Sequence, residues 1–241
     1  TLIVSFVIGV GLMLFGKRSE KKINFIEQLI LIILVYLLIS FFIALPFYLS
    51  NYQVTFLNSF FEAISGFTGT GFSIFENVKY LDPTLIIWRS SSQWLGGLYF
   101  LFFLIFIFSN KQFNYKMIEL TYSGDGNINS ENNIKDSILK IFILYSVLSL
   151  VIFMLLNISG SRMFNSLNLS MSLISSGGFL PTDSLDKIIK SNLQKIIFTF
   201  SLLISMLNFF LVLNIFQKKI IIREHKEDLY LIFLSLVFIL L

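Results

Sequence analysis

Long uncharged, apolar stretches separated by short charged clusters form the dominant pattern of this sequence. Three such stretches, of 21, 21 and 22 residues, lie between charged neighbours: Arg89 and Lys111, Lys140 and Arg162, and Lys195 and Lys218. At about 1.5 Å rise per residue, each makes roughly 30 Å of helix, which matches the hydrocarbon core of a bilayer. A fourth span is predicted over residues 25–48, ending near Pro46. The pattern therefore predicts an all-α integral membrane protein.

The first and last segments, 1–16 and 229–241, are also apolar but shorter. The sequence starts with Thr1 inside one of them and stops inside the other, so we expect it to be part of a longer membrane protein. A secretory signal is a poor interpretation of the first segment, because its basic residues follow the apolar stretch instead of preceding it.

Composition narrows the classes of function. The chain is 56% hydrophobic and 13% charged, against about 25% charged in a soluble domain. It has no Cys and a single His, His225, which excludes disulfides, thiolate chemistry and multi-histidine metal centres. The net charge of +4 lies in loops beside apolar runs, where membrane topology explains it without nucleic acid. No cofactor and no transition-metal site is expected in this chain.

Basic residues indicate the orientation. The segments around 17–24, 110–140 and 217–228 hold four Lys or Arg each, whereas the two long connections between them hold six in total. Loops rich in Lys and Arg stay on the cytoplasmic side. We therefore expect loops 17–24, 110–137 and 217–228 to lie in the cytoplasm, with the chain in the cytoplasmic (inner) membrane of the cell.

The two outward connections, 51–85 and 159–192, each contain an apolar stretch too short to cross the membrane. Residues 58–67 precede the sequence Thr-Gly-Thr-Gly-Phe-Ser, and residues 165–174 precede Ser-Ser-Gly-Gly-Phe-Leu-Pro. An apolar stretch of about 10–14 residues is a candidate re-entrant segment. Irregular backbone at membrane depth requires surrounding protein or a water-filled cavity. An ordinary surface loop packed on the helix ends is the alternative.

An internal repeat favours the re-entrant interpretation. A shift of 107 residues superposes residues 58–73 on 165–180, and the flanking spans superpose as well. Five positions are then identical: Asn58, Ser59, Ser65, Gly71 and Phe72. The repeated unit is a span, a short helix, a Gly-containing loop and a second span. Repeats of this kind are common in transport folds.

Such a loop can coordinate a cation through backbone carbonyl oxygens, which replace the ion's water shell without a fixed charge. Gly71 and Gly178 permit the backbone conformations that turn carbonyls inward. Thr68 and Thr70 can add hydroxyl oxygens. The two short helices would point their partially negative C-terminal ends at the ion.

Three motifs resemble the Trk/Ktr/HKT superfamily of potassium transporters, and most closely its bacterial TrkH-type membrane subunit. They are Ala44-Leu-Pro-Phe47, the run from Phe60 to Gly71, and the run from Trp88 to Gly97. The stretch 176–183, with its Ser-Gly-Gly-Phe sequence, resembles the family's second pore loop. Asn208-Phe209 and residues 223–228 resemble the opening of its third repeat. The resemblance covers essentially the whole chain.

The resemblance implies four span–pore-helix–span repeats around one ion pathway, with one re-entrant filter loop from each repeat. The corresponding segments are 1–24 as the end of an N-terminal hairpin with a cytoplasmic loop, 25–108 as repeat one, 109–137 as a cytoplasmic loop, 138–216 as repeat two, and 217–241 as a cytoplasmic loop and the start of repeat three. It also implies K⁺ uptake through a filter of backbone carbonyls. The filter residues are Thr68, Gly69, Thr70 and Gly71 in loop one, and Ser175, Ser176, Gly177 and Gly178 in loop two.

The same resemblance implies partners. In this family the membrane subunit pairs as a homodimer and binds a cytoplasmic ring of nucleotide-binding regulatory domains of the TrkA or KtrA type. The sequence has no nucleotide-binding loop of its own, so nucleotide control would come from that ring. The polar loop 122–133 is a candidate to face it, whereas His225 lies in a charged cytoplasmic run that solvent would cover.

Departures from the family pattern leave alternatives open. Gly69 replaces the middle Thr of the usual Thr-Thr-Thr-Gly loop, and bulky Phe72 follows Gly71 where a small residue is usual. Gly at the position of Gly71 accompanies K⁺ selectivity in this family, and Ser accompanies Na⁺ permeation. A Na⁺-permeable or non-conducting relative is therefore the alternative. An intramembrane enzyme is disfavoured, because the spans hold no His, Asp pair or metal cluster to activate a nucleophile.

Three charged residues near the loops have more than one interpretation each. Glu62 braces the first loop, attracts cations at its mouth, or is only a charge at a helix start near the interface. Arg89 either positions the filter through contacts with carbonyls or a Glu, or reaches to the membrane interface. Asp183 either concentrates cations outside or caps the next helix.

Overall fold

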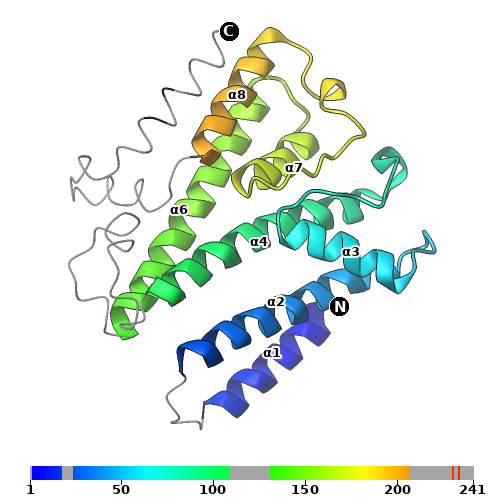
Figure 1. The fold of residues 1–241 in the computed structure, drawn as a ribbon. Helices are drawn as coiled ribbons and strands as arrows, with labels where there is room; N and C mark the ends of the chain where they lie inside the picture. The colour runs from blue at the N-terminus through cyan, green and yellow to red at the C-terminus, as the bar shows by residue number, and fades with distance from the viewer. Residues whose placement is uncertain (1, 18–23, 109–130, 207–229, 231–232, 234–241) are drawn as a thin grey trace.

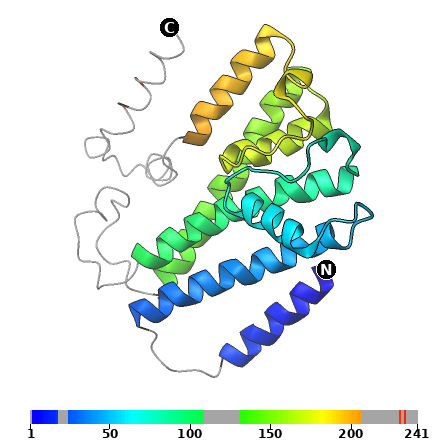
Figure 2. The same ribbon diagram turned by 45° about the vertical axis from the view of Figure 1, so that its right-hand side comes forward.

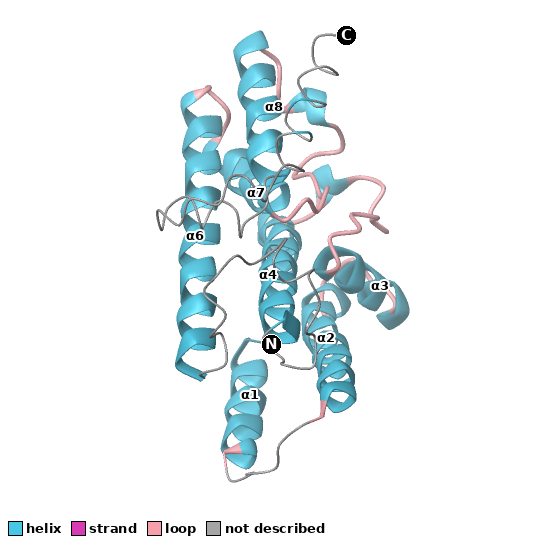
Figure 3. Ribbon diagram, turned by 60° about the vertical axis from the view of Figure 1, so that its left-hand side comes forward, coloured by secondary structure: helices cyan, strands magenta, loops and turns pink. Residues whose placement is uncertain are grey.

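The computed structural model describes residues 2–17, 24–108, 131–206, 230 and 233 of the 241-residue chain. These ranges consist of helices joined by loops, and they contain no strand (Figure 3). The helices in chain order are α1 (Leu2–Gly16), α2 (Phe25–Tyr48), α3 (Phe56–Phe67), α4 (Pro83–Phe108), α6 (Glu131–Ile158), α7 (Met163–Ile174) and α8 (Asn192–Met206), with the 3-10 turns η1 (Val78–Tyr80) and η2 (Leu185–Lys187).

Three of these helices are long and apolar enough to cross a membrane: α2, α4 over Pro83–Ile107, and α6 over Lys135–Ile158. The span expected over residues 25–48 is confirmed, because α2 has these bounds. Helices α1 and α8 are apolar but shorter within the described residues. The start of the third repeat, His225 and most of the three loops expected in the cytoplasm lie outside the described residues.

Helix α4 holds the fold together, because it lies between two groups of helices (Figure 1). On one side it packs on α2 and α3 around Ala44, Phe47 and Phe67. On the other side it packs on α6 and α7 around Ile105 and Ile152. Helix α1 lies at the edge of the molecule beside α2 (Figures 1 and 2), and none of its side chains is buried.

The internal repeat predicted from the sequence is confirmed in the positions of the elements. Helices α3 and α7 have bounds that differ by 107 residues at both ends, and so do the turns η1 and η2. The preceding spans, α2 and α6, also overlap after the same shift. Each repeat therefore places a short helix, a loop and a 3-10 turn in the same order after a long span.

Several helix boundaries differ from the sequence prediction. Helix α3 begins two residues before the expected position 58, because the Thr55 hydroxyl caps it by accepting the Asn58 N–H at 3.4 Å. Helix α7 likewise begins at Met163 instead of 165. Helix α6 begins at Glu131, so residues 131–137, expected in a loop, are helical. Helix α4 begins at Pro83, so Arg89 lies inside the helix and not at its start.

Candidate functional site

The first candidate filter loop folds back on the end of α3. The Gly69 N–H donates to the Gly66 carbonyl at 3.0 Å, and the Thr70 and Gly71 N–H groups donate to the Ser65 carbonyl at 3.0 and 3.3 Å. These bonds use carbonyls that the helix end would otherwise leave without partners. The chain therefore leaves α3 in a tight turn and not as an extended loop.

The second loop repeats this turn at the end of α7. The Ser176 N–H donates to the Leu173 carbonyl at 2.9 Å, and the Gly177 N–H donates to the Ser172 carbonyl at 2.8 Å. With the 107-residue shift, these are the same bonds that Gly69 and Thr70 make. The two loops therefore share one backbone path.

Backbone torsion angles repeat in the same way. Gly71 and Gly178 both have φ of 79°. Two residues earlier in each loop, Gly69 and Ser176 have φ of 69° and 53°. These values lie in the left-handed region, which glycine adopts without a steric penalty. Ser176 adopts it at a cost, of the kind that clusters at functional sites. This left-handed conformation explains why both turns have a glycine at the position of Gly71 and Gly178.

The two loops lie against each other. A Cβ on Gly69 would lie 3.4 Å from the Ser175 carbonyl oxygen. A Cβ on Gly71 would overlap the Gly177 carbonyl oxygen and lie 3.5 Å from the Gly178 Cα. The two loops that the sequence assigned to the filter are therefore in contact, although they come from two repeats.

Most carbonyl oxygens of the two loops are available to a ligand. Among the described residues, no donor bonds the backbone carbonyls of residues 68–71 or those of Ser175, Ser176 and Gly178. The Gly177 carbonyl differs, because it accepts a hydrogen bond from the Gln93 amide. Free carbonyl oxygens at close quarters can replace the water shell of a hard cation.

The threonine hydroxyls of the first loop are linked to each other. Thr68 and Thr70 share a hydrogen bond between their hydroxyl oxygens. The Thr68 hydroxyl also donates to the Ser65 carbonyl at 3.3 Å. The two hydroxyls therefore tie the loop to the end of α3.

Glu62 and Arg89 form a buried ion pair behind the loops. Arg89 Nε donates to Glu62 Oε1 at 2.8 Å, and the two side chains are 2% and 0% exposed. Glu62 also accepts the Ser73 hydroxyl at 3.1 Å and the Ile74 N–H at 2.8 Å. The carboxylate therefore holds the segment that follows the first loop.

Arg89 also reaches the second loop. Its guanidinium donates to the Leu180 carbonyl at 3.4 Å and lies 4.2 Å from the centre of the Phe179 ring. A further bond, at 2.9 Å, goes to the Ser73 hydroxyl. An arginine that is 2% exposed and bonded on both sides does not reach to the membrane interface, so that interpretation is wrong.

Gln93 is a site residue that the sequence analysis did not single out. Its side chain is fully buried in α4, its Nε2 donates to the Gly177 carbonyl, and its Oε1 accepts the Phe179 N–H at 3.2 Å. Both groups of the amide are therefore used to hold the second loop. The signal was present in the sequence, because an amide in an apolar span is costly unless it is hydrogen-bonded.

Asp183 joins the outer segments of the two repeats. Its carboxylate accepts the Lys187 ammonium at 2.6 Å and the Lys79 N–H at 3.1 Å. These two donors hold the pKa of the Asp183 carboxyl below its usual value. The following 3-10 turn has Ser184 at its N-cap. The carboxylate thus bonds Lys79 of the first repeat and not the start of α8.

These features define a class: an integral membrane protein built from repeated span–pore-helix–span units with paired re-entrant loops. A family model for TrkH, described as a cation transport protein, matches residues 1–241. The chain therefore belongs to the TrkH family of cation transport proteins. The resemblance inferred from the three sequence motifs is confirmed.

Individual relatives agree with this assignment. The chain is 28% identical over 172 residues to an uncharacterized cation transporter of Methanocaldococcus jannaschii, which covers 70% of this chain and 35% of the relative. It is 30% identical over 99 residues to the Trk system potassium uptake protein TrkG of Escherichia coli, over 41% of this chain and 20% of that protein. It thus spans about a third or less of the length of these relatives.

A solved structure has the same fold. The crystal structure of the potassium transporter TrkH from Vibrio parahaemolyticus matches this chain with a TM-score of 0.66 and 23% sequence identity. The match covers 83% of this chain and 40% of the other. At this identity, the likeness establishes the arrangement of the helices and loops.

Proposed function

We propose that the whole protein takes up K⁺ across the cytoplasmic membrane through a central pore. Its filter would include backbone carbonyls of residues 68–71 and 175–178. The observation that carries the proposal is the pair of matching loops: they come from two repeats, lie in contact, and have the same positive φ at Gly71 and Gly178. Membership of a cation transporter family supports it. Relatives named as potassium uptake proteins make K⁺ the first candidate ion.

The side chains around the loops would act as a frame for the filter. The Glu62–Arg89 pair and Gln93 hold the segments that follow the two loops through several hydrogen bonds. Discrimination between K⁺ and Na⁺ depends on how the carbonyl groups are held around the ion. Either the size of the cavity between them or the number and field strength of their dipoles sets the preference. We therefore assign these three residues to positioning and not to direct contact with the ion.

A Na⁺-permeable pore is the second candidate, and Phe72 favours it. The Phe72 side chain is 69% exposed beside Gly71, whereas its repeat counterpart Phe179 is 2% exposed and packs on Arg89. Both loops therefore have Phe after the glycine, but the two Phe side chains lie in different environments. An asymmetric filter of this kind can hold its ion differently from a filter with four small residues there.

For partners, we propose a homodimer that binds a cytoplasmic nucleotide-binding subunit of the TrkA or KtrA type. The support is family membership alone. Co-expression of that subunit therefore belongs in any functional test.

The test is growth at limiting K⁺ of a bacterium that lacks its own K⁺ uptake systems, with the whole protein and its regulatory subunit expressed. We expect rescue by the unchanged protein. Gly71→Ser should reduce ⁸⁶Rb⁺ uptake by at least tenfold, because the new Cβ would overlap the Gly177 carbonyl and the residue would have to keep φ near 79°.

Gly11→Ser is the matched control, since a Cβ at Gly11 meets no atom within 4 Å in the described residues. It should leave uptake unchanged. Failure of the unchanged protein to rescue growth, with membrane insertion verified, would contradict K⁺ uptake. A ²²Na⁺ flux measurement would then separate the Na⁺-permeable from the non-conducting alternative.

A further inference from the structure

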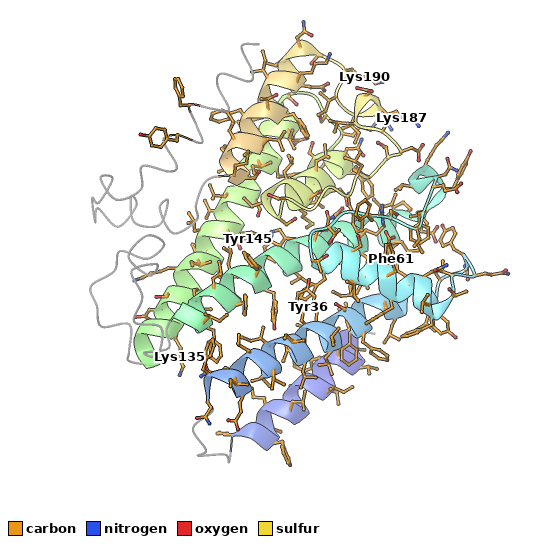
Figure 4. All side chains as sticks on the ribbon, in the orientation of Figure 1. Tyr36, Phe61, Lys135, Tyr145, Lys187 and Lys190 are labelled. Atoms are coloured by element: carbon orange, nitrogen blue, oxygen red, sulfur yellow. The ribbon has the colours of Figure 1, made fainter. Side chains whose placement is uncertain are left out.

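A polar pocket of about 580 Å³ lies at the junction of α6, α7 and α8, apart from the filter loops. Its lining includes Lys79, Arg162, Asn165, Asp183, Lys190 and Gln194, and it shares no residue with segments 68–71 or 175–178. Figure 4 shows Lys187 and Lys190 together at the end of the molecule opposite Lys135. This is the face that the distribution of basic residues predicts to be outward.

Cations are concentrated in this pocket. Four basic side chains line it: Lys79, Arg162, Lys187 and Lys190. Of the carboxylates in the two outward connections, Asp183 lines the pocket, whereas Glu62, Glu76, Asp82 and Asp186 do not. Asp183 is paired with Lys187. Among the described residues, Arg162 and Lys190 form no ion pair. The pocket therefore keeps an excess of positive charge that would repel K⁺ and attract an anion.

A buried chain of hydrogen bonds directs a donor into the pocket. Gln194 Oε1 accepts the Lys190 and Ser191 N–H groups at 2.8 and 3.1 Å, which fixes the orientation of the amide. Gln194 Nε2 then donates to the Ser161 hydroxyl at 3.4 Å. Because that hydroxyl oxygen accepts, its own hydrogen is free for a ligand. Ser161 is 7% exposed and lines the pocket.

The start of α7 adds backbone donors. Arg162 occupies the N-cap of this 12-residue helix and its side chain makes no capping bond. The first N–H groups of a helix have no partner within the helix and attract negative charge. Arg162 and Asn165, at this helix start, both line the pocket.

Apolar side chains surround the same three helix ends. Ile158 at the end of α6, Met163 at the start of α7 and Leu193 at the start of α8 are 79%, 68% and 58% exposed. Each is next in sequence to a residue that lines the pocket. An anion that carries hydrocarbon chains would therefore match the site better than a free ion, because its chains can cover this apolar surface.

We propose that this pocket binds the phosphate group of an anionic phospholipid in the outward leaflet. Arg162 and Lys190 bind the phosphate oxygens, Ser161 donates a hydrogen bond, and the acyl chains lie over Ile158, Met163 and Leu193. The cavity volume lies within the range of about 300–1,000 Å³ typical of small-ligand sites. Bound in this way, the lipid would bridge the ends of α6, α7 and α8.

The test titrates phosphatidylglycerol into the whole detergent-solubilised protein and measures bound lipid by native mass spectrometry. Arg162→Gln and Lys190→Gln should each weaken binding about fivefold, and the double variant about 25-fold, as expected for loss of one basic contact each. Lys195→Gln is the matched control: it removes an exposed lysine of α8 that does not line the pocket, and should change binding less than twofold.

The charge-conserving pair Arg162→Lys with Lys190→Arg should retain most of the binding, which separates loss of charge from loss of folding. Phosphatidylcholine, which carries no net charge, should bind at least tenfold more weakly. Equal binding of phosphatidylcholine, or of phosphatidylglycerol to the double variant, would overturn the proposal. Displacement of the lipid by millimolar inorganic phosphate would overturn the lipid assignment in favour of a free anion.

Discussion

Arg89 and Glu62 show how a charged pair can be kept inside an apolar molecule. Both are buried, and every strong bond they make is to a polar group of the loops or to each other. The second repeat has Leu169 and Ile196 at the positions that correspond after the 107-residue shift. Leu169 is buried but Ile196 is 67% exposed, so the second repeat has no buried counterpart of the ion pair at these positions.

The burial of this ion pair gives a prediction at the scale of single residues. Glu62→Leu or Arg89→Ile alone leaves one buried charge without its partner and should lower the free energy of unfolding by about 3–5 kcal/mol. The double variant removes both charges and leaves only neutral groups, such as the Ile74 N–H, without partners, so it should lose about 1–3 kcal/mol.

Denaturant unfolding of the whole protein measures these values. A double variant that loses as much as the two single variants together would mean that the two side chains do not act as a pair. ⁸⁶Rb⁺ uptake of the double variant then reports on the positioning role separately from stability.

The sequence offered a contact between Arg89 and a Glu as one of two interpretations and could not decide between them. Glu62 was placed near the first loop, but the partner of Arg89 depends on where α4 begins, and Pro83 starts the helix well before the uncharged stretch. Counting from charge to charge thus placed Arg89 at a boundary when it lies inside. Gln93 was missed for a related reason, since its target is the backbone of the other repeat, 84 residues away.

At the scale of elements, glycine decides how closely α4 approaches the short helices. A Cβ on Gly96 would overlap the Phe67 carbonyl at the end of α3, and a Cβ on Gly97 would lie 2.7 Å from the Tyr145 hydroxyl and 3.0 Å from the Ser175 Cβ. Gly96 therefore faces the end of α3 in the first repeat, and Gly97 faces α6 and the second loop in the second repeat. They allow α4 to contact the bases of both loops.

Gly96→Ala should consequently destabilise the protein by about 1–3 kcal/mol, the usual cost of overpacking, although Ala favours helix more than Gly does. Gly11→Ala in α1 is the control, because its Cβ meets no atom within 4 Å in the described residues. It should be neutral or stabilising by up to about 1 kcal/mol. Thermal unfolding of both variants measures this difference, and Gly96→Ala should have the lower melting temperature. Equal melting temperatures would contradict the close packing of α4 on α3.

The elements were the best-predicted level of this structure. Uncharged length located α2, and short apolar stretches related by the 107-residue shift located both short helices, because each depends on a pattern spread over many residues. The starts of α3 and α7 were missed by two residues, since a single cap such as Thr55 sets them. The backbone bonds that fold each loop onto its helix were not predictable from spacing.

At the scale of the whole molecule, the orientation can be tested directly, because these 241 residues contain no cysteine. Asn77→Cys and Asn192→Cys, in exposed positions of the two outward connections, should react with a membrane-impermeant maleimide in intact cells. Lys17→Cys, in an exposed position after α1, should react only after the membrane is permeabilised. The fully buried Ser40→Cys should react in neither case.

Labelling of Lys17→Cys from outside would reverse the predicted orientation. It would also move the basic pocket to the cytoplasmic leaflet. The orientation and the lipid proposal are thus linked by one measurement that depends on neither transport nor lipid binding.

The Arg89 guanidinium, which belongs to the first repeat, holds the Leu180 carbonyl of the second. The Gln93 amide, also in the first repeat, accepts the Phe179 N–H and donates to the Gly177 carbonyl. The second loop thus takes part of its support from a helix outside its own repeat. Exchange of the second span–pore-helix–span unit alone between family members would transfer the loop sequence without its support. Functional chimaeras should therefore need α4 and the second unit to be exchanged as one piece.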